Sequence, residues 1–137
     1  MTMEMLEVGD IMTPRVVTAD VDAPITKISK DMELMGIGSV VITKGGKPVG
    51  IVTDRDIALK VTMADRKPSE IKAKEVMTSP LITIEQDAPQ ERACELMAET
   101  GVRRIPVMED DKLVGIISVR NVLTRNPACI KTLYPSE

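Results

Sequence analysis

The chain contains no histidine, no phenylalanine and no tryptophan, and Tyr134 is its one tyrosine. The absence of histidine removes the usual general base and the commonest metal ligand. The near absence of aromatic side chains removes the platforms on which proteins stack the bases of single-stranded nucleic acids. We therefore expect no catalysis, no required cofactor and no metal site, and binding of single-stranded nucleic acid is disfavoured.

The charge of the chain is nearly balanced, with 18 basic and 21 acidic residues and a formal net charge of −3. Its longest basic runs are the pairs Arg66-Lys67 and Arg103-Arg104. Binding to duplex DNA through counterion release needs clustered lysines and arginines. Nucleic acid is therefore an unfavoured partner, and a nucleic-acid regulator stays open only as an alternative.

Signals for membranes, for export and for disulfides are also lacking. No stretch approaches the roughly 18 apolar residues that a membrane span needs. Glu4, Glu7 and Asp10 fit neither a signal peptide nor a basic transit peptide. The two cysteines, Cys94 in a helical pattern and Cys129 near the C-terminus, do not have the number or spacing of a disulfide framework. We predict two free thiols in a cytoplasmic protein that does not associate with membranes.

What the chain does have is an internal repeat. A shift of 65 residues aligns residues 12–57 (copy one) with residues 77–122 (copy two) without a gap. Thirteen aligned pairs are identical: Met12/Met77, Thr13/Thr78, Thr18/Thr83, Asp22/Asp87, Ala23/Ala88, Pro24/Pro89, Met32/Met97, Gly36/Gly101, Lys47/Lys112, Val49/Val114, Gly50/Gly115, Ile51/Ile116 and Arg55/Arg120. Neither copy is long enough to bury its own apolar face, so the two copies are expected to pack together.

Each copy begins with a short β-branched run, over residues 16–18 and 81–84, which predicts a buried strand. A helix is predicted next, with an aspartate cap, a proline in its first turn and a glycine at its left-handed end. These residues are Asp22, Pro24 and Gly36 in copy one and Asp87, Pro89 and Gly101 in copy two. Apolar residues spaced by three and four give the first helix one apolar face: Ile25, Ile28, Met32 and Met35.

Two antiparallel strands are predicted after each helix, over residues 39–43 and 47–53 in copy one and over 104–108 and 112–118 in copy two. The segments between them, Lys44-Gly45-Gly46 and Glu109-Asp110-Asp111, have the composition of tight turns. A second short helix is predicted to start at Thr53-Asp54 and at Ser118-Val119.

The predicted fold class is α/β (α+β), with two β-α-β-β-α repeats packed with pseudo-two-fold symmetry into one module. The first domain is expected over residues 1–61, a charged linker over 62–74, the second domain over 75–124 and a C-terminal tail over 125–137.

A glycine-rich stretch, residues 45–50, looks superficially like a phosphate-binding loop. It lacks the spacing of that loop and the serine or threonine after its lysine, and it lies in a predicted hairpin. We interpret it as a turn.

The informative motif is Gly50-Ile51-Val52-Thr53-Asp54-Arg55-Asp56, matched in copy two by Gly115-Ile116-Ile117-Ser118-Val119-Arg120-Asn121. It places a hydroxyl and free backbone N–H groups at the start of a helix, where an anion such as phosphate is favoured. The arginine adds a bidentate phosphate donor. A hydroxyl followed three residues later by an acid is equally the pattern of a helix capping box, so both readings stay open. The arginine tilts the balance slightly toward phosphate, because capping does not require it.

With these motifs, the leading segments Asp10-Ile11-Met12-Thr13-Pro14 and Glu75-Val76-Met77-Thr78 and the central segments 38–42 and 102–107, the chain resembles a pair of CBS domains. This module is named after cystathionine β-synthase, and the resemblance covers residues 8–123. It implies that two repeats form one module whose clefts commonly hold AMP, ADP, ATP or S-adenosylmethionine.

The resemblance also implies roles for residues that match its motifs. Asp56 and Asn121 would contact ribose, and phosphate would meet Thr53, Arg55, Ser118 and Arg120. Backbone groups at Thr18, Ala19, Thr83 and Ile84 would face the adenine edge, and the base would lie against Ser39, Val40, Val41, Arg104, Ile105 and Pro106. Arg103 and Arg104 are further phosphate candidates, with a solvated strand edge as the alternative reading. Because copy two has asparagine where the pattern usually has aspartate, copy one is favoured as the better site.

The leading hypothesis is a stand-alone sensor that binds an adenosine nucleotide or S-adenosylmethionine, forms a homodimer and signals to an unknown effector protein by a change of conformation. A structural or protein-interaction module without a ligand is the second hypothesis.

Overall fold

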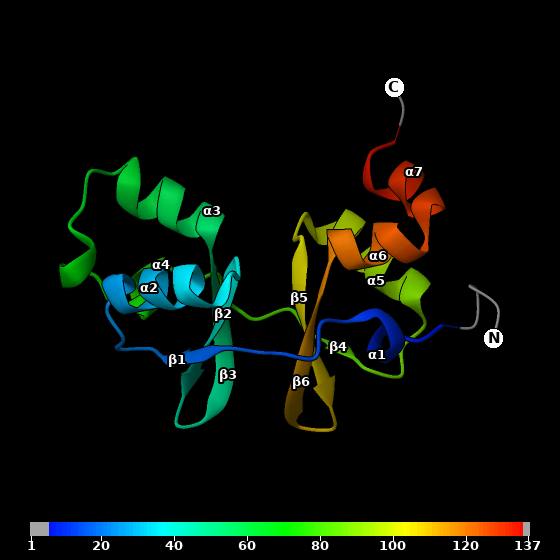
Figure 1. Ribbon diagram of the computed structural model, residues 1–137, viewed down its shortest axis with the longest axis horizontal. Coiled ribbons are helices and arrows are strands. Elements are labelled where there is room, and N and C mark those ends of the chain that lie inside the picture. The colour runs from blue at the N-terminus through cyan, green and yellow to red at the C-terminus, as the bar shows by residue number, and fades with distance from the viewer. Residues whose placement is uncertain (1–5, 136–137) are drawn as a thin grey trace. The chain divides into compact units, whose positions relative to one another are not determined.

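The computed structural model describes residues 6–135, which form two compact units (Figure 1). The copy-one unit is the continuous segment Val17–Leu81. The copy-two unit contains residues 82–135 together with the N-terminal residues 6–16. Residues 1–5 and 136–137, at the outer ends of the predicted first domain and tail, lie outside the described residues.

The copy-one unit is built on a three-stranded sheet in the order β1 (Thr18–Asp20), β2 (Ser39–Lys44) and β3 (Lys47–Thr53). β1 is parallel to β2, and β2 is antiparallel to β3. Helix α2 (Ile25–Met35) joins β1 to β2, and α3 (Asp54–Ile57) follows β3 and continues as the π-helical turn η2 (Ala58–Thr62). The hairpin is closed by Gly45 and Gly46, both with positive φ, as the Gly-Gly turn predicts.

The copy-two unit repeats this topology, with a sheet in the order β4 (Ile84–Glu85), β5 (Arg104–Glu109) and β6 (Lys112–Ser118). Helix α5 (Gln90–Thr100) joins β4 to β5, and α6 (Val119–Arg125) follows β6. The short helices η4 (Pro127–Cys129) and α7 (Ile130–Leu133) follow α6. The predicted α+β class, the hairpins and the second helices are therefore confirmed in both copies.

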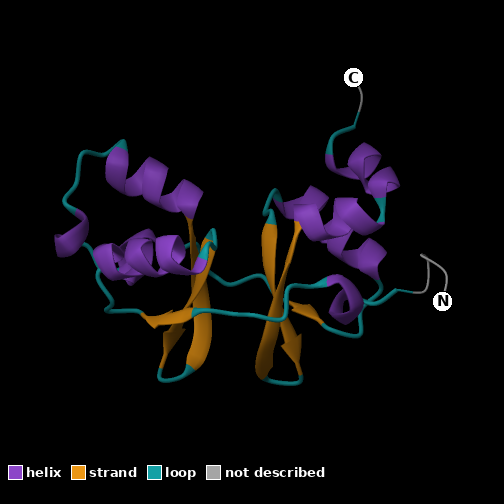
Figure 2. Cartoon of the chain, in the orientation of Figure 1, coloured by secondary structure: helices purple, strands orange, loops and turns teal. Residues whose placement is uncertain are grey.

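In each unit the helices cover one face of the sheet, and the core lies between them (Figure 2). In copy one, Ile25, Ile28 and Met32 of α2 are buried against Val40, Ile42 and Val52 of the sheet. Three of the four residues of the predicted apolar face are thus in the core, whereas Met35 is 40% exposed. The α2 and α5 helices both end at a left-handed glycine, Gly36 and Gly101, as predicted.

Two local predictions were wrong. The positions predicted to be aspartate caps lie outside the helices, because Pro24 and Pro89 take the N-cap positions of α2 and α5 in extended conformation. The first strands begin later than predicted, at Thr18 and Ile84, because the backbone reaches its parallel partner only there. Asp22 instead pairs with Lys74 and Lys72, which lower the pKa of its exposed carboxyl group.

The segment predicted as a linker packs on copy one. Ile71 is buried, and its carbonyl accepts a hydrogen bond from the N–H of Ile25 at 2.9 Å. Helix α4 (Ala73–Val76) follows, and the N–H of Ala73 donates to the carbonyl of Ala23 at 2.8 Å. Residues 71–76 are therefore part of the copy-one unit.

The segments that lead into the two copies are exchanged between the units. Helix α1 (Val8–Ile11), which precedes copy one in the sequence, belongs to the copy-two unit, and its Val8 is fully buried there. Thr13 next to it exchanges both backbone hydrogen bonds with Ile116 of β6, at 2.8 and 2.9 Å. Thr78, which leads into copy two, does the same with Ile51 of β3, at 2.8 and 3.1 Å. Each unit therefore combines one copy with the leading segment of the other.

The repeated glycines Gly50 and Gly115 make room for these leading segments. A Cβ atom at Gly115 would lie 2.7 Å from the carbonyl oxygen of Thr13 and would also collide with the sulfur of Met12. A Cβ atom at Gly50 would lie 2.6 Å from the sulfur of Met77. The glycine of each motif is thus explained by close approach of the backbone.

Gly115→Ala is expected to lower the free energy of unfolding by about 1–3 kcal/mol, because the added methyl group overpacks this contact. Urea unfolding followed by circular dichroism measures the change. The double variant Gly115→Ala/Met12→Ala lacks the collision with the sulfur. Its loss of unfolding free energy should therefore be smaller than the sum of the losses in Gly115→Ala and Met12→Ala alone. If Gly115→Ala had the same free energy of unfolding as the wild type, the close contact would be contradicted.

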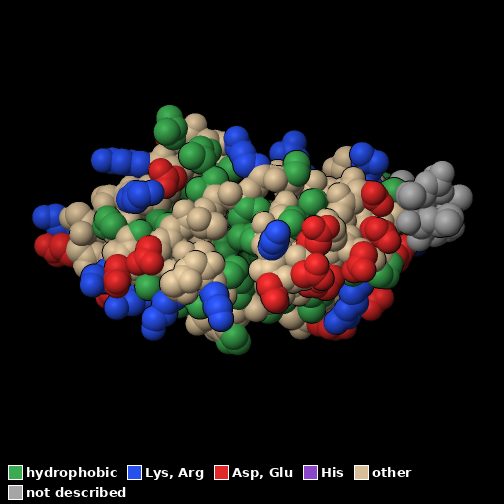
Figure 3. Space-filling view, turned by 90° about the horizontal axis from the view of Figure 1, so that it is seen from below, with side chains coloured by type: hydrophobic (Ala, Val, Ile, Leu, Met, Phe, Trp, Pro, Cys, Tyr) green, Lys and Arg blue, Asp and Glu red, His purple; other side chains and the backbone are tan. Residues whose placement is uncertain are grey.

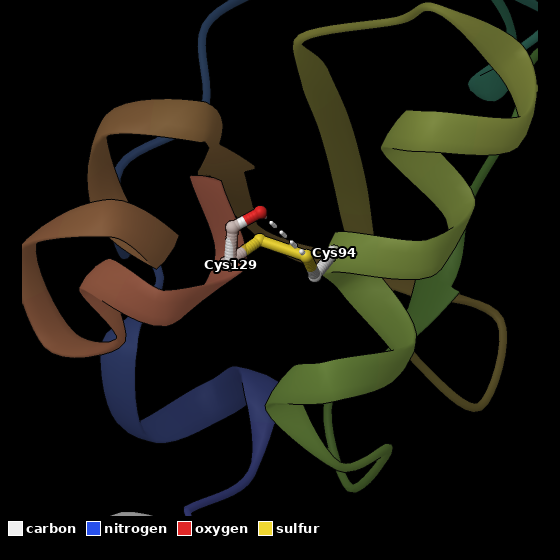
Figure 4. The surroundings of a disulfide bond; sticks show 2 residues. All are labelled: Cys94 and Cys129. Atoms are coloured by element: carbon white, nitrogen blue, oxygen red, sulfur yellow. Dashed lines mark hydrogen bonds between the residues drawn. A yellow bond between two sulfur atoms is a disulfide. The ribbon is translucent and has the colours of Figure 1, made fainter. Parts of the chain in front are cut away.

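The prediction of two free thiols is corrected by the structure. Cys94 of α5 and Cys129 of η4 form a disulfide, with Cα atoms 6.2 Å apart (Figure 4). Both side chains are buried, and both residues belong to the copy-two core. The Cys94 sulfur also lies 3.6 Å from the carbonyl oxygen of Cys129; this is a contact and not a hydrogen bond, because a disulfide sulfur carries no proton. The sequence could not show the pairing because helix α5 and the C-terminal segment meet only in the folded unit.

Candidate functional site

The two glycine motifs form the same local structure, in which a strand ends and a short helix begins. Thr53 and Ser118 are the N-cap residues of α3 and α6. The Thr53 hydroxyl accepts from the N–H of Asp56 at 3.2 Å, and the Asp56 carboxylate accepts from the N–H of Thr53 at 2.9 Å. Ser118 and Asn121 make the same reciprocal pair at 3.1 and 2.8 Å. The capping-box reading is therefore confirmed in both copies.

Asp56 has more partners than its counterpart in copy two. It is buried, and its second carboxylate oxygen accepts from the Thr78 hydroxyl at 3.1 Å and lies 3.1 Å from the ammonium group of Lys60. Lys60 also donates to the carbonyl of Val76 at 2.8 Å. Burial of a carboxylate is tolerated when its charge is paired and hydrogen-bonded. A ribose that approached Asp56 would compete with these partners, so its predicted role as a ribose acceptor stays a prediction.

A cavity at a predicted site lies in the copy-two unit, and we call it the arginine pocket. Its volume is about 620 Å³, and its lining consists of Arg103, Arg104, Ser118, Val119, Arg120, Leu123 and Thr124. A neighbouring hollow of about 410 Å³ shares Ser118, Arg120 and Thr124 and adds Ile11, Thr13, Asn121 and Arg125. The two linings hold arginine side chains and hydroxyl groups, and neither contains a carboxylate. The arrangement suits an anion that carries hydroxyl or phosphate groups.

Five predicted ligand residues of copy two meet at these two hollows: Arg103, Arg104, Ser118, Arg120 and Asn121. The other predicted residues of copy two lie elsewhere. Ile105 is fully buried in the core, Ile84 and Pro106 are buried, and Thr83 is exposed. Sequence reasoning missed Leu123 and Thr124, although Thr124 follows Arg120 by one helical turn and so lies on the same face of α6.

The predicted residues of copy one are not brought together at a described cavity. The hollow of about 230 Å³ in that unit is lined by Ser29, Met32, Glu33, Ile37, Asp54 and Ile57, none of which was predicted to bind a ligand. Thr18 and Arg55 are exposed, Ser39 is half-buried, and Ala19, Val40 and Val41 are buried. The expectation that copy one is the better site stays a prediction.

Residues 6–135 hold no candidate for a metal centre or for a membrane-spanning helix. Within that range no three or more His, Cys, Asp and Glu side chains gather in a way that could hold a metal ion. No helix within that range combines the length and the apolar character needed to cross a membrane.

Comparison with known proteins places both copies in one family. The family model of the CBS domain matches residues 8–62 and again residues 73–127. An uncharacterized protein of Methanopyrus kandleri is 35% identical over 133 residues, covering 96% of this chain and 68% of that protein. A CBS domain-containing protein of Bacillus subtilis, YhcV, is 32% identical over 115 residues, covering 84% of this chain and 81% of its own length.

Solved structures show the same fold. A hexameric CBS-CP12 protein from bloom-forming cyanobacteria superposes with a TM-score of 0.84 at 29% sequence identity, over 97% of this chain and 77% of that one. This superposition and the family match agree on a repeated α+β unit.

Proposed function

This chain belongs to the CBS-domain family, and we propose that it is a regulatory protein which binds a phosphorylated adenosine nucleotide in the arginine pocket. Binding would favour one of two conformations and so change contact with an effector protein, because a ligand acts only through different affinities for two states. The proposal includes no catalytic step. The observation that carries it is the cavity of about 620 Å³ lined by three arginines.

The lining of the arginine pocket matches the parts of such a nucleotide. Guanidinium groups bind phosphate through two parallel hydrogen bonds, and Arg103, Arg104 and Arg120 supply three of them. The hydroxyl groups of Ser118 and Thr124 also line the pocket, with their protons donated to Asn121 and to the carbonyl of Arg120, and Val119 and Leu123 offer apolar surface for the base. The negatively charged phosphates of AMP, ADP and ATP fit the positive charge of the three arginines. S-adenosylmethionine fits it less well, because its sulfonium group is cationic and would meet like charge.

Calorimetric titration with AMP, ADP, ATP and S-adenosylmethionine tests this function. We expect saturable heat with the phosphorylated ligands and weaker binding of S-adenosylmethionine. Arg120→Gln should weaken nucleotide binding by about tenfold to a hundredfold, since a hydrogen bond to a charged group contributes about 1.5–3 kcal/mol. The matched control is Arg55→Gln, the same change at the equivalent position of copy one, which should leave the affinity within about twofold.

Absence of heat with all four ligands would contradict the proposal. Equal losses of nucleotide affinity in Arg120→Gln and Arg55→Gln would show that the nucleotide does not bind in the arginine pocket.

A protein-interaction module is the second candidate, and one observation favours it. Large apolar side chains of the copy-one unit are exposed, with Leu34 82% and Met63 74% accessible. Such side chains are common at contacts with another protein. We propose that the partner is a second copy of this chain, so that the protein forms a homodimer. The CBS-CP12 protein of cyanobacteria, which is described as hexameric, is an example of a CBS protein that assembles from several copies. Sedimentation of the purified chain distinguishes a monomer from a homodimer, and repeating it with ATP shows whether the nucleotide changes that state.

Nucleic acid remains an unfavoured partner. On the face drawn in Figure 3, acidic and basic side chains both appear, and acidic groups gather over part of it. A phosphate backbone is bound by a continuous basic surface instead.

A cytoplasmic location is also part of this proposal, and fractionation of cells tests it.

A further inference from the structure

The part of the C-terminal tail that follows α6 in the described structure, residues 126–135, is attached to the copy-two unit by a covalent bond. Its helices η4 and α7 follow α6, and Cys129 of η4 is joined to Cys94 in the middle of α5 (Figure 4). Both cysteine side chains are at most 5% exposed. The disulfide therefore holds the start of the tail on α5, five residues before Tyr134.

Beyond the disulfide, the tail contacts an arginine of the pocket. The phenol oxygen of Tyr134 accepts a hydrogen bond from the Nη1 group of Arg103. The guanidinium carbon of Arg103 also lies over the Tyr134 ring, 5.3 Å from its centroid, which is a cation–π contact. Leu133 and Tyr134 line a crevice of about 80 Å³ together with Arg103 and Val119. Arg103 and Val119 are thus shared between this crevice and the arginine pocket.

Tyr134 orders Arg103 without neutralising it. A phenol is uncharged at neutral pH, so the guanidinium group keeps its full positive charge and its remaining N–H donors. An exposed arginine just before a strand, as Arg103 is before β5, otherwise samples many rotamers, and binding of a phosphate would have to stop that motion. An arginine that is already held gives tighter binding for this reason.

We propose that Tyr134 is a positioning residue for Arg103 and that the Cys94–Cys129 disulfide determines whether it acts, so that the tail is a redox-dependent clamp on the arginine pocket. This proposal rests on the proposed function. It adds to it a second input, the thiol–disulfide state of the chain.

The redox step is a thiol–disulfide exchange with a dithiol reductant. The S–S bond between Cys94 and Cys129 breaks, two S–H bonds form, and two electrons and two protons pass from the dithiol, which becomes a disulfide. Because both sulfur atoms are buried, the exchange proceeds when the tail lifts from α5. Once reduced, the tail keeps only its non-covalent contacts, and Tyr134 leaves Arg103 more often.

The test is ATP titration by calorimetry on the full chain, oxidised or treated with dithiothreitol, well below the unfolding temperature of both forms. Reduction and Tyr134→Ala should each weaken ATP binding by about two- to tenfold, the effect of releasing one ordered side chain. Tyr134→Phe, which keeps the ring contact, should lose less. In an Arg103→Gln background neither change should have a further effect, whereas an Arg104→Gln background should keep both effects.

The lone tyrosine supplies a second readout. Because the chain contains no tryptophan, tyrosine fluorescence anisotropy reports the mobility of Tyr134 directly. It should fall on reduction of the wild type and stay unchanged when the double variant Cys94→Ala/Cys129→Ala is treated with dithiothreitol.

The outcomes separate this proposal from the function on which it rests. A wild-type chain that binds no nucleotide overturns both. A chain that binds ATP with equal affinity before and after reduction, or whose Tyr134→Ala loss persists with Arg103→Gln, overturns the clamp alone.

Discussion

Opening the Cys94–Cys129 disulfide is expected to lower the free energy of unfolding by about 3–4 kcal/mol. The bond closes a loop across a sequence separation of 35 residues, and the chain-entropy relation assigns about this value to a loop of that length. For a domain of this size the loss corresponds to a fall of roughly 10 °C in Tm. Thermal unfolding with and without reductant measures it.

The control for this prediction is the double variant Cys94→Ala/Cys129→Ala, which should unfold at about the same temperature with and without reductant. Intact-mass analysis of protein purified without reductant shows whether the bond is closed, since closure removes two hydrogen atoms. A chain that is fully oxidised and unfolds at the same temperature after reduction would contradict the prediction.

Asp56→Ala is expected to lower the free energy of unfolding by about 2–4 kcal/mol, because it leaves buried donors without their acceptor. The lost interactions are the backbone and hydroxyl hydrogen bonds of Thr53, the hydroxyl hydrogen bond of Thr78 and the ion pair with Lys60. Urea unfolding followed by circular dichroism gives the difference. The alanine variant is thus a poor test of ribose binding, since it damages the fold first.

Asp56→Asn is the matched control, because it installs the residue that copy two carries at the equivalent position. Asn121 makes the same capping pair with Ser118 through its side-chain oxygen. The asparagine variant should therefore lose only about 1 kcal/mol, mainly from the exposed partner Lys60. Equal losses for alanine and asparagine would show that the charge of Asp56, and not its capping geometry, stabilises this junction.

Local features of the fold were predictable from the sequence, since local residues determine them. The Gly-Gly hairpin, the left-handed ends at Gly36 and Gly101 and the helices that start at Thr53 and Ser118 all depend on neighbours in the chain. The caps assigned to aspartate were wrong because a proline two residues later takes the cap position.

The long-range features were not predictable, for two separate reasons. The disulfide depends on how the tail returns to α5, which no local pattern encodes. The exchange of leading segments is hidden by the repeat itself, because Met12-Thr13 and Met77-Thr78 are identical and either could pair with either copy. For the site, the sequence identified the arginines of the pocket, and only the structure brings Tyr134 to Arg103.

The exchange of leading segments has a consequence for how the protein is made. The copy-one unit is one continuous stretch, so a ribosome delivers all of it by the time Leu81 has emerged. Residues 6–16 are synthesised before that unit, yet their partners in β6 come about a hundred residues later in the chain. We therefore expect the copy-one unit to fold first during translation, while the oldest part of the chain is among the last to reach its place.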